Sequence, residues 1–488
     1  MNCTRPLGGS LRSFANLIYT YLPELLWWLG GPAAWALQAY RLMLFVVLLL
    51  PGFLPHAFRY FFTSPHVWAS SYGDSVRHRL DVYVPLGPNG EPLATKEGAA
   101  VPIVVFVTGG AWIIGYRMWG FLLGFALQKH GVICICVDYR NFPQARIPQM
   151  IDDVSDALDW VYEHASTLGG SPDDITLVGQ SAGAHLSAMV LLRIMRQRQD
   201  ASSRPPLRRF VGISGPYDMP KIKPSLSKRG LHPGLIDALA CGRLAEVSPS
   251  LLLPASATRR PTPSSIVGDV EHGEKAPTAV AFATTAATDF APTAATDFAP
   301  TAATDFAPTA ATASAPAAAT ASAPASADDV DGSRSRRRRA SSDGASSPAG
   351  ADGARPRHRR ASSDASMALL RTLGAAADAS SWKADWPPIV LLHGTADQTV
   401  PWEQSHDFAM RLRACGAYSV TERYYENKSH TDPIVEDPLC GGDVLLADLL
   451  DMVLGPADRT AELKAGLWPS MLPAPRWLFP LAKRINPF

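Results

Sequence analysis

Short apolar runs separated by amphipathic stretches predict alternating strands and helices over two parts of the chain. Arg79 to Val84 alternates polar and apolar positions, the two-residue period of a strand that is exposed on one face. Other short runs are rich in β-branched residues, typical of parallel strands covered on both faces, and they occupy 102–107, 132–137, 175–178, 210–213 and 389–392. Between them, apolar positions recur at helical spacing over 151–161, and a further helix is expected over 184–198. This order predicts an α/β fold with a doubly wound, mostly parallel sheet.

A long apolar stretch near the N-terminus has no place in this alternation. Leu25 to Tyr40 and Leu42 to Phe58 are apolar runs of 16 and 17 residues, divided by Arg41. A membrane-spanning helix needs about 20 apolar residues, so the two runs together fit a hairpin, or one tilted span beside an interfacial helix. We predict a membrane-anchor region over 1–64, with a cleaved signal peptide or a packed soluble helix as the alternatives.

The stretch 254–381 also departs from the pattern. The eight residues Thr-Ala-Ala-Thr-Asp-Phe-Ala-Pro occur three times in tandem, beginning at Thr285, and Ala, Thr, Ser and Pro dominate afterwards. Too few large apolar side chains are present to offset the entropy lost on folding, so we predict a disordered insertion. Within it, Ser341 and Ser362 each follow an Arg-Arg-x pattern that basophilic kinases favour, although chance in a basic loop explains the pattern equally well.

Gly179-Gln180-Ser181-Ala182-Gly183 is the sharpest chemical motif in the chain. It follows the expected strand at 175–178 and precedes a helix, which is the context in which G-x-S-x-G presents a nucleophilic serine. The tight turn raises the hydroxyl above the edge of the sheet, and the helix N-terminus behind it favours developing negative charge. We expect Ser181 to be the nucleophile of a hydrolase.

A serine hydroxyl needs a base within hydrogen-bonding reach, and in this fold the acid and the histidine follow the serine along the chain. Asp397 comes just after the run at 389–392, and His430 follows a further expected strand at 420–425. Because parallel strands end at one edge of the sheet, both side chains are expected near Ser181. We predict the catalytic triad Ser181, His430 and Asp397.

Other residues compete for these roles. His185 lies on the helix after the serine, where a packing role is more common, and His393 is expected to order the loop that holds Asp397. Asp432 is an alternative acid, but it is only two residues from His430 and is poorly placed to reach the ring. Asp407 falls within an expected helix, 403–415.

Backbone N–H groups must stabilise the oxyanion that such a serine creates. Ala182 supplies one of them, and the Thr-Gly-Gly-Ala-Trp sequence after the run at 102–107 is placed to supply the others. The predicted oxyanion and substrate-binding residues are Gly109, Gly110, Ala111, Trp112, Gln180 and Ala182. A plain glycine turn, or a packing role for the tryptophan, would give the same pattern.

The charge and the cysteine content limit the classes of partner and cofactor that we expect. The formal net charge of +1 gives no general attraction to nucleic acid, and the six cysteines show neither a C-x-x-C pair nor zinc-type spacing. We therefore expect a reducing compartment, a catalytic domain that faces the cytosol, and no metal or organic cofactor.

At these residues the chain resembles the isoprenylcysteine (prenylcysteine α-carboxyl) methylesterases, which belong to the hormone-sensitive-lipase-like carboxylesterases of the α/β-hydrolase superfamily. The resemblance covers about 95–253 and 385–450, and its motifs lie at 105–115, 138–143, 179–185, 393–397 and 429–432. It implies an α/β-hydrolase fold and hydrolysis of the methyl ester of a prenylated C-terminal cysteine at the endoplasmic reticulum or Golgi membrane. A prenyl chain partitions into lipid, which is consistent with a membrane anchor.

The expected organisation begins with a membrane anchor at 1–64. The hydrolase domain follows in two parts, 65–253 and 382–460, which are separated by the insertion at 254–381, and an interfacial tail occupies 461–488. A broader carboxylesterase or lipase, or a formamidase-like hydrolase, would use the same triad. A non-catalytic receptor or scaffold on this fold is a further alternative, although such proteins usually lose a member of the triad.

Overall fold

The computed structural model describes most of the predicted hydrolase domain and part of both terminal regions. The residues described are 24, 28, 32–63, 67–87, 100–197, 207–228, 231–232, 234–254, 382, 385–440, 443–456 and 478–485. The predicted insertion lies outside them apart from Pro254, and so do Ser341 and Ser362. The boundaries of the predicted regions therefore stay predictions.

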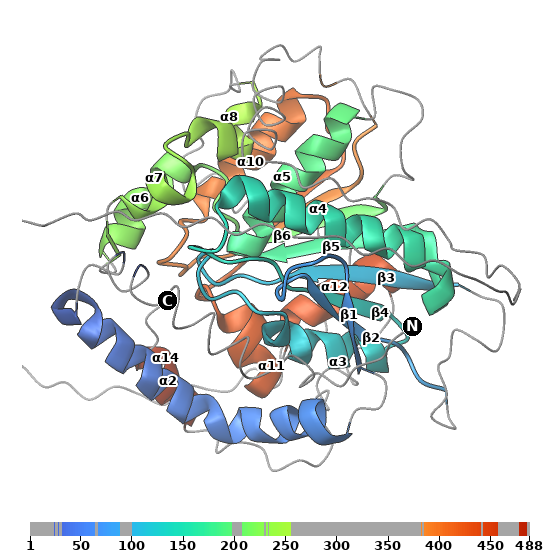
Figure 1. Cartoon of the computed structure of the whole chain (residues 1–488), viewed down its shortest axis with the longest axis horizontal. Helices are drawn as coiled ribbons and strands as arrows, with labels where there is room; N and C mark the ends of the chain where they lie inside the picture. Colours follow the sequence, from blue (N-terminus) through green and yellow to red (C-terminus); the bar gives the residue numbers. More distant parts are fainter. Residues whose placement is uncertain are drawn as a thin grey trace, which may run out of the picture. The chain divides into compact units, whose positions relative to one another are not determined.

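An eight-stranded sheet forms the centre of the hydrolase domain (Figure 1). Its spatial order is β1-β2-β4-β3-β5-β6-β7-β8; β1 and β2 are antiparallel to their neighbours, and the other strands are parallel. The strands are β1 (Val67–Ser71), β2 (Arg79–Tyr83), β3 (Val101–Val107), β4 (Ile133–Val137), β5 (Gly170–Gln180), β6 (Arg209–Ile213), β7 (Ile389–Gly394) and β8 (Val420–Tyr425). The predicted α/β-hydrolase fold with a mostly parallel sheet is confirmed.

Helices cover both faces of the sheet (Figure 1). The helices that pack on the sheet are α3 (Phe121–Lys129), α4 (Ile147–His164), α5 (Ala182–Gln197), α10 (Glu403–Ala414) and α12 (Val444–Leu454). Shorter elements are η3 (Arg117–Gly120), η4 (Ser166–Leu168), α6 (Met219–Lys228), α7 (Leu235–Leu239), η5 (Ala245–Val247), α8 (Pro249–Leu252), η8 (Asp432–Glu436) and α11 (Asp437–Cys440).

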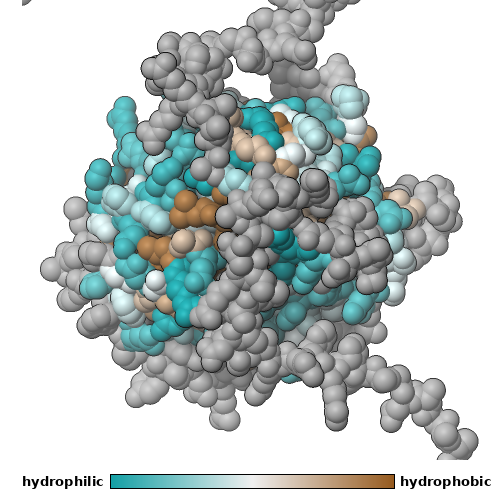
Figure 2. All heavy atoms as spheres, turned by 90° about the horizontal axis from the view of Figure 1, so that it is seen from above, coloured by the Kyte–Doolittle hydropathy of each residue, from teal (hydrophilic) through white to brown (hydrophobic). Residues whose placement is uncertain are grey.

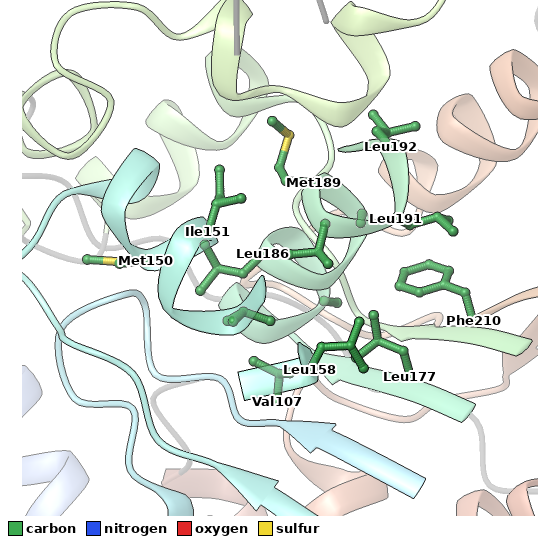
Figure 3. Close-up of a cluster of buried hydrophobic side chains, with 14 of the residues drawn as sticks. Val107, Met150, Ile151, Leu158, Leu177, Leu186, Met189, Leu191, Leu192 and Phe210 are labelled. Atoms are coloured by element: carbon green, nitrogen blue, oxygen red, sulfur yellow. The ribbon is translucent and has the colours of Figure 1, made fainter. Parts of the chain in front are cut away.

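The central strands are apolar throughout because both faces are buried. Along β3, Val105 belongs to the core beneath α4 and α5, whereas Val104 and Phe106 belong to the core beneath α3 and α12. Figure 3 shows the first of these cores, where strand side chains meet those of α4 and α5, including Leu158 and Leu186. Each fully buried leucine of this kind contributes about 1.5–3 kcal/mol of transfer free energy, which holds the helices against the sheet.

The register brings the carboxyl ends of the parallel strands to one edge. Val107 at the end of β3 is paired with Gly179 of β5, and Gln180 is paired with Ile213 at the end of β6. Since β7 and β8 continue the parallel arrangement, the loops after β3, β5, β7 and β8 all emerge on this edge.

A long apolar helix precedes the sheet. Helix α2 (Pro32–Phe58) continues into a π-helical segment, η1 (Arg59–Thr63), and the stretch Tyr40–Phe62 is long and apolar enough to cross a membrane. One side packs on the protein: Phe45 and Leu49 contact Ala482 of α14 (Leu478–Ile485), and further along the Phe53 ring lies 6.0 Å from that of Phe121.

The other side of this helical stretch is exposed and apolar. Its exposed large apolar side chains are Tyr40, Met43, Val46, Val47, Leu50, Leu54, Phe58 and Phe62, and we call this set the apolar stripe. By contrast, on the face seen in Figure 2 hydrophilic side chains predominate among the described residues, and the most prominent group of hydrophobic ones lies left of centre.

Candidate active site

Ser181 occupies a sharp turn between β5 and α5. Its backbone φ is 54°, a left-handed conformation that costs about 1–3 kcal/mol and is held by the Ser181 N–H donating to the Ile213 carbonyl at 2.8 Å. A Cβ on Gly183 would lie 2.0 Å from the Val107 carbonyl oxygen, and one on Gly179 would lie 2.5 Å from that of Gly183. The two glycines of the motif are therefore required by close backbone approach.

His430 lies between Ser181 and Asp397. The Ser181 Oγ is 2.9 Å from His430 Nε2, and His430 Nδ1 is 2.7 Å from Asp397 Oδ2. All three side chains are less than a tenth exposed. Since a carboxylate can only accept, Nδ1 carries the hydrogen of the neutral ring and Nε2 is left to accept the serine proton.

Asp397 is held by four donors. The N–H groups of Thr399 and Val400 donate to Oδ1 at 2.8 and 2.9 Å, while the His393 and His430 rings face Oδ2 at 3.2 and 2.7 Å. Burial alone would raise the pKa of Asp397, but the electrostatic interaction with His430 and the hydrogen bonds from both imidazoles outweigh it. They hold the pKa of this carboxyl well below its usual value, so it is charged at neutral pH.

His393 orders this loop, as the sequence predicts. Its Nε2–H is shared between Asp397 Oδ2 and the Val400 carbonyl, at 3.2 and 2.9 Å. Its Nδ1 is 2.7 Å from the hydroxyl of Ser405 on α10. Of the other acids weighed for the site, Asp407 pairs with Lys221 at 2.6 Å and Asp432 accepts the Ser429 N–H at 2.7 Å.

The loop after β3 lies against the nucleophile turn. A Cβ on Gly109 would be 2.9 Å from Ser181 Cβ and 2.2 Å from Gln180 Oε1, so the loop backbone touches the turn. The next residues are left-handed, with φ of 121° at Gly110, 50° at Ala111 and 62° at Trp112. We call residues 109–115 the oxyanion loop.

The N–H groups of this loop are available to a ligand. Gly110 accepts from Ile113 and Ile114 through its carbonyl, both at 2.9 Å, whereas the N–H groups of Gly110 and Ala111 donate to none of the described backbone. Ala182 is the first residue of α5, where an N–H has no partner within the helix. Gly110, Ala111 and Ala182 therefore remain candidates for the oxyanion donors that the sequence predicts.

The oxyanion loop is held at both ends by residues that the sequence analysis did not single out. The Gly115 carbonyl accepts from the Arg77 guanidinium and, at 2.7 Å, from the side-chain amide of Asn141. Arg77 is itself paired with Asp138 at 2.9 Å, and the Tyr139 hydroxyl donates to the Thr108 carbonyl at 3.1 Å. The motif at 138–143 pointed to three of these residues as a resemblance only, and nothing in the sequence marked Arg77.

Two further predicted positions are buried rather than open to a ligand. Trp112 is 1% exposed, and its indole N–H donates to His185 Nδ1 at 3.2 Å; Gln180 is 4% exposed, with its amide against the oxyanion loop. Among the described residues, no three or more histidines, cysteines or acidic residues are grouped so as to hold a metal ion.

Comparison with known proteins identifies the family. The BD-FAE family model matches residues 90–230. The probable isoprenylcysteine alpha-carbonyl methylesterase ICME of Oryza sativa subsp. japonica is 30% identical over 472 residues, which cover 95% of this chain and 82% of that protein. The chain belongs to the isoprenylcysteine alpha-carbonyl methylesterase family.

The chain is also similar to other curated proteins and to solved structures. The isoprenylcysteine alpha-carbonyl methylesterase ICME of Arabidopsis thaliana is 28% identical over 95% of this chain and 80% of that protein. The esterase LipC of Mycobacterium tuberculosis is 30% identical over 42% of this chain and 49% of that protein. Among solved structures, the apo form of Thermogutta terrifontis esterase 2 aligns with 80% of this chain and 97% of that one, at 15% identity and a TM-score of 0.41.

Membership of the isoprenylcysteine methylesterase family confirms the resemblance that the sequence motifs indicated. It also shows the class of reaction: this methylesterase-family chain is a carboxylic ester hydrolase of the α/β-hydrolase fold.

Proposed function

We propose that this protein hydrolyses the methyl ester of prenylated C-terminal cysteines, with Ser181 as nucleophile, His430 as general base and Asp397 as the acid that orients it. The observation that carries the proposal is the continuous path from Asp397 Oδ2 through His430 to Ser181 Oγ, with contacts of 2.7 and 2.9 Å. Such an arrangement is the basis of serine esterase chemistry on several folds.

The reaction takes two steps. His430 Nε2 takes the Ser181 proton as the oxygen attacks the ester carbonyl, and the N–H groups of Gly110, Ala111 and Ala182 stabilise the oxyanion. His430 then gives the proton to the departing methoxide, so that methanol leaves and an acyl-serine forms. Water, deprotonated by His430, attacks this ester, and the proton returns to Ser181 as the free carboxylate is released.

The substrate class is supported by the family and by the rim of the site. The rice and Arabidopsis relatives are both named isoprenylcysteine methylesterases. Ile114 of the oxyanion loop and Trp119 of η3 are 52% and 54% exposed, and the Trp119 indole N–H donates to the Ile114 carbonyl at 3.0 Å. We infer that these two exposed apolar side chains offer a prenyl chain a surface to pack on.

Membrane association is part of the proposal, and the apolar stripe supports it. Lipid is the environment in which a row of exposed apolar side chains on one side of a helix is stable, and the opposite side of α2 packs on the protein. We propose that the stripe enters the bilayer while the catalytic domain stays at its surface, where a prenylated substrate is concentrated. The endoplasmic reticulum or Golgi membrane, with the site facing the cytosol, is the expected location.

Replacing the nucleophile tests the assignment. Ser181→Ala removes the attacking oxygen but no core volume, so turnover should fall by at least about 10⁴-fold with little change in unfolding midpoint. Methanol release from a prenylcysteine methyl ester measures it, and covalent labelling by a fluorophosphonate reports the nucleophile directly. Undiminished turnover or labelling in the variant would refute the assignment.

The same assay separates the alternatives. A wild-type preference for short-chain p-nitrophenyl or formyl substrates over the prenylcysteine ester would favour a broader esterase or a formamidase. A wild-type protein that does not label would favour a receptor or scaffold.

The membrane role is tested within the stripe. The double change Leu50→Glu and Leu54→Glu puts two charges on it and should lower binding of the full-length protein to phosphatidylcholine vesicles by at least about tenfold, measured by flotation. Val444→Glu, which changes an exposed apolar residue on α12, is the matched control and should bind as wild type. Equal flotation of the double variant and the wild type would contradict the role of the stripe.

A further inference from the structure

His185 connects the oxyanion loop to the helix that carries the nucleophile. It lies one turn into α5, and its N–H donates to the Ser181 carbonyl at 3.0 Å. Its side chain is completely buried. The Trp112 indole N–H donates to His185 Nδ1 at 3.2 Å, with the two rings edge to face at 5.4 Å between centroids.

The second ring nitrogen fixes the state of this histidine. His185 Nε2 is 2.7 Å from the Val247 carbonyl of η5, which can only accept, so Nε2 carries the hydrogen. Nδ1 is then a bare acceptor, which is what the indole N–H requires. Burial lowers the pKa of His185 to about 4, so the ring is neutral at physiological pH.

Trp112 needs such an anchor because of its backbone. It follows Ala111, and both have positive φ although neither is glycine. A side chain in this region favours relaxation to negative φ, and relaxation here would rotate the peptide groups on either side of Ala111. Among the described residues, the Trp112 carbonyl accepts the Phe142 N–H at 2.8 Å, and the indole bond to His185 holds the other end of the residue.

We propose that His185 is a positioning residue for the oxyanion loop: by accepting the Trp112 indole N–H, it keeps the N–H groups of Gly110 and Ala111 directed at the oxygen that becomes negative in the reaction. The inference rests on the proposed function of this loop. The sequence analysis favours a packing role for His185. We assign it instead a role in transition-state stabilisation, which it exerts through Trp112 and not by touching the substrate.

Paired substitutions separate the two hydrogen bonds of the ring. Asparagine places its side-chain oxygen near the position of Nδ1 and keeps an acceptor for Trp112, whereas glutamine reaches Val247 with its amide and loses that acceptor. We expect His185→Gln and Trp112→Phe each to lower kcat by about 10- to 100-fold with KM within about twofold of wild type. His185→Asn should retain kcat within about threefold. The Trp112→Phe, His185→Gln double variant should be no slower than the slower single variant, because both changes break one contact.

The readouts are kcat and KM for p-nitrophenyl acetate, inhibition by a trifluoromethyl ketone that forms a tetrahedral adduct, and the urea midpoint of unfolding. Ketone affinity should fall in parallel with kcat. His164→Gln is the matched control: His164 stacks on Trp160 at 4.1 Å between centroids, on α4, and its loss should leave kcat unchanged.

Wild-type kcat in Trp112→Phe would overturn the inference. Equal losses of kcat in His185→Asn and His185→Gln, in parallel with a lower unfolding midpoint, would also overturn it, because they would indicate a packing role alone. An equal loss of kcat in His164→Gln would overturn it as well. Failure of the proposed function is distinguishable, because wild-type protein would then neither hydrolyse the ester nor label with a fluorophosphonate.

Discussion

Asp397→Asn replaces one carboxylate oxygen by an NH₂ group. It should prevent His430 from acting as a base without disturbing the loop that holds residue 397. Oδ1 accepts the N–H groups of Thr399 and Val400, so the amide must keep its oxygen on that side. If it turned over, its NH₂ would face two backbone N–H groups, which cannot become acceptors. On the other side the His430 ring can change tautomer, and the Nε2–H of His393 keeps the Val400 carbonyl as its acceptor. The NH₂ therefore faces His393 and His430 in the place of Oδ2.

The consequence is a change of tautomer. With a donor opposite it, His430 Nδ1 must become an acceptor, and the ring hydrogen moves to Nε2, where it points at Ser181 Oγ. The ring can then no longer take the serine proton. A loss of about 10⁴-fold in kcat is the size expected for a triad in this state, equivalent to about 5 kcal/mol in the activation free energy.

The assay is kcat for a p-nitrophenyl ester, together with the rate of fluorophosphonate labelling, which should fall with it. Asp432→Asn is the control, because Asp432 accepts the Ser429 N–H and has no role in the proposed mechanism. Its kcat should stay within about tenfold of wild type. A loss below about tenfold in Asp397→Asn, or a larger loss in Asp432→Asn, would show that the orienting acid has been misassigned.

Two further outcomes follow from the close packing and burial of the site. Gly109→Ala brings a methyl group 2.9 Å from Ser181 Cβ and from the Gln180 carbonyl oxygen, so the oxyanion loop must shift. Steady-state kinetics should show a kcat lower by about 10²–10³-fold. An unchanged kcat would mean that the shift of the loop has no effect on catalysis. Burial lowers the pKa of His185 to about 4 in the folded protein, against 6.5 for an exposed histidine, so the unfolded chain takes up the proton first. The stability that this difference provides is complete above pH 6.5 and is lost as the pH falls toward 4. Between pH 7 and pH 5 the wild type should lose about 2 kcal/mol of unfolding free energy more than His185→Gln does in urea titrations, and equal losses would contradict the buried neutral ring.

Much of the architecture follows from patterns that burial imposes on the sequence. The runs at 102–107, 132–137 and 389–392 correspond to β3, β4 and β7, because central parallel strands are apolar on both faces. The sequence analysis did not find β1, an edge strand of five residues with two serines, or the helices α3 and α12. In α3 the apolar residues fill nearly every position, so the helical period is masked.

The residues of the candidate site also fall into those that the sequence could predict and those that it could not. Residues that take part directly in the proposed chemistry lie in motifs with fixed spacing to strand ends, so Ser181, Asp397 and His430 could be predicted. Arg77 and the role of His185 could not, because each acts through a neighbour, and the contact between His185 and Trp112 joins residues 73 positions apart. Only coordinates give such pairs.

The two parts of the hydrolase domain on either side of residues 255–381 are joined by more than the connecting chain. Strand β6 before this stretch pairs with β7 after it in the interior of the sheet, and the Arg411 guanidinium binds the carbonyls of Ser250 and Leu253. A protease cut within the stretch should therefore leave two polypeptides that stay associated, with Ser181 on one and His430 on the other. Changes in its length should also be tolerated, because the free energy of closing a chain segment grows only with the logarithm of its length.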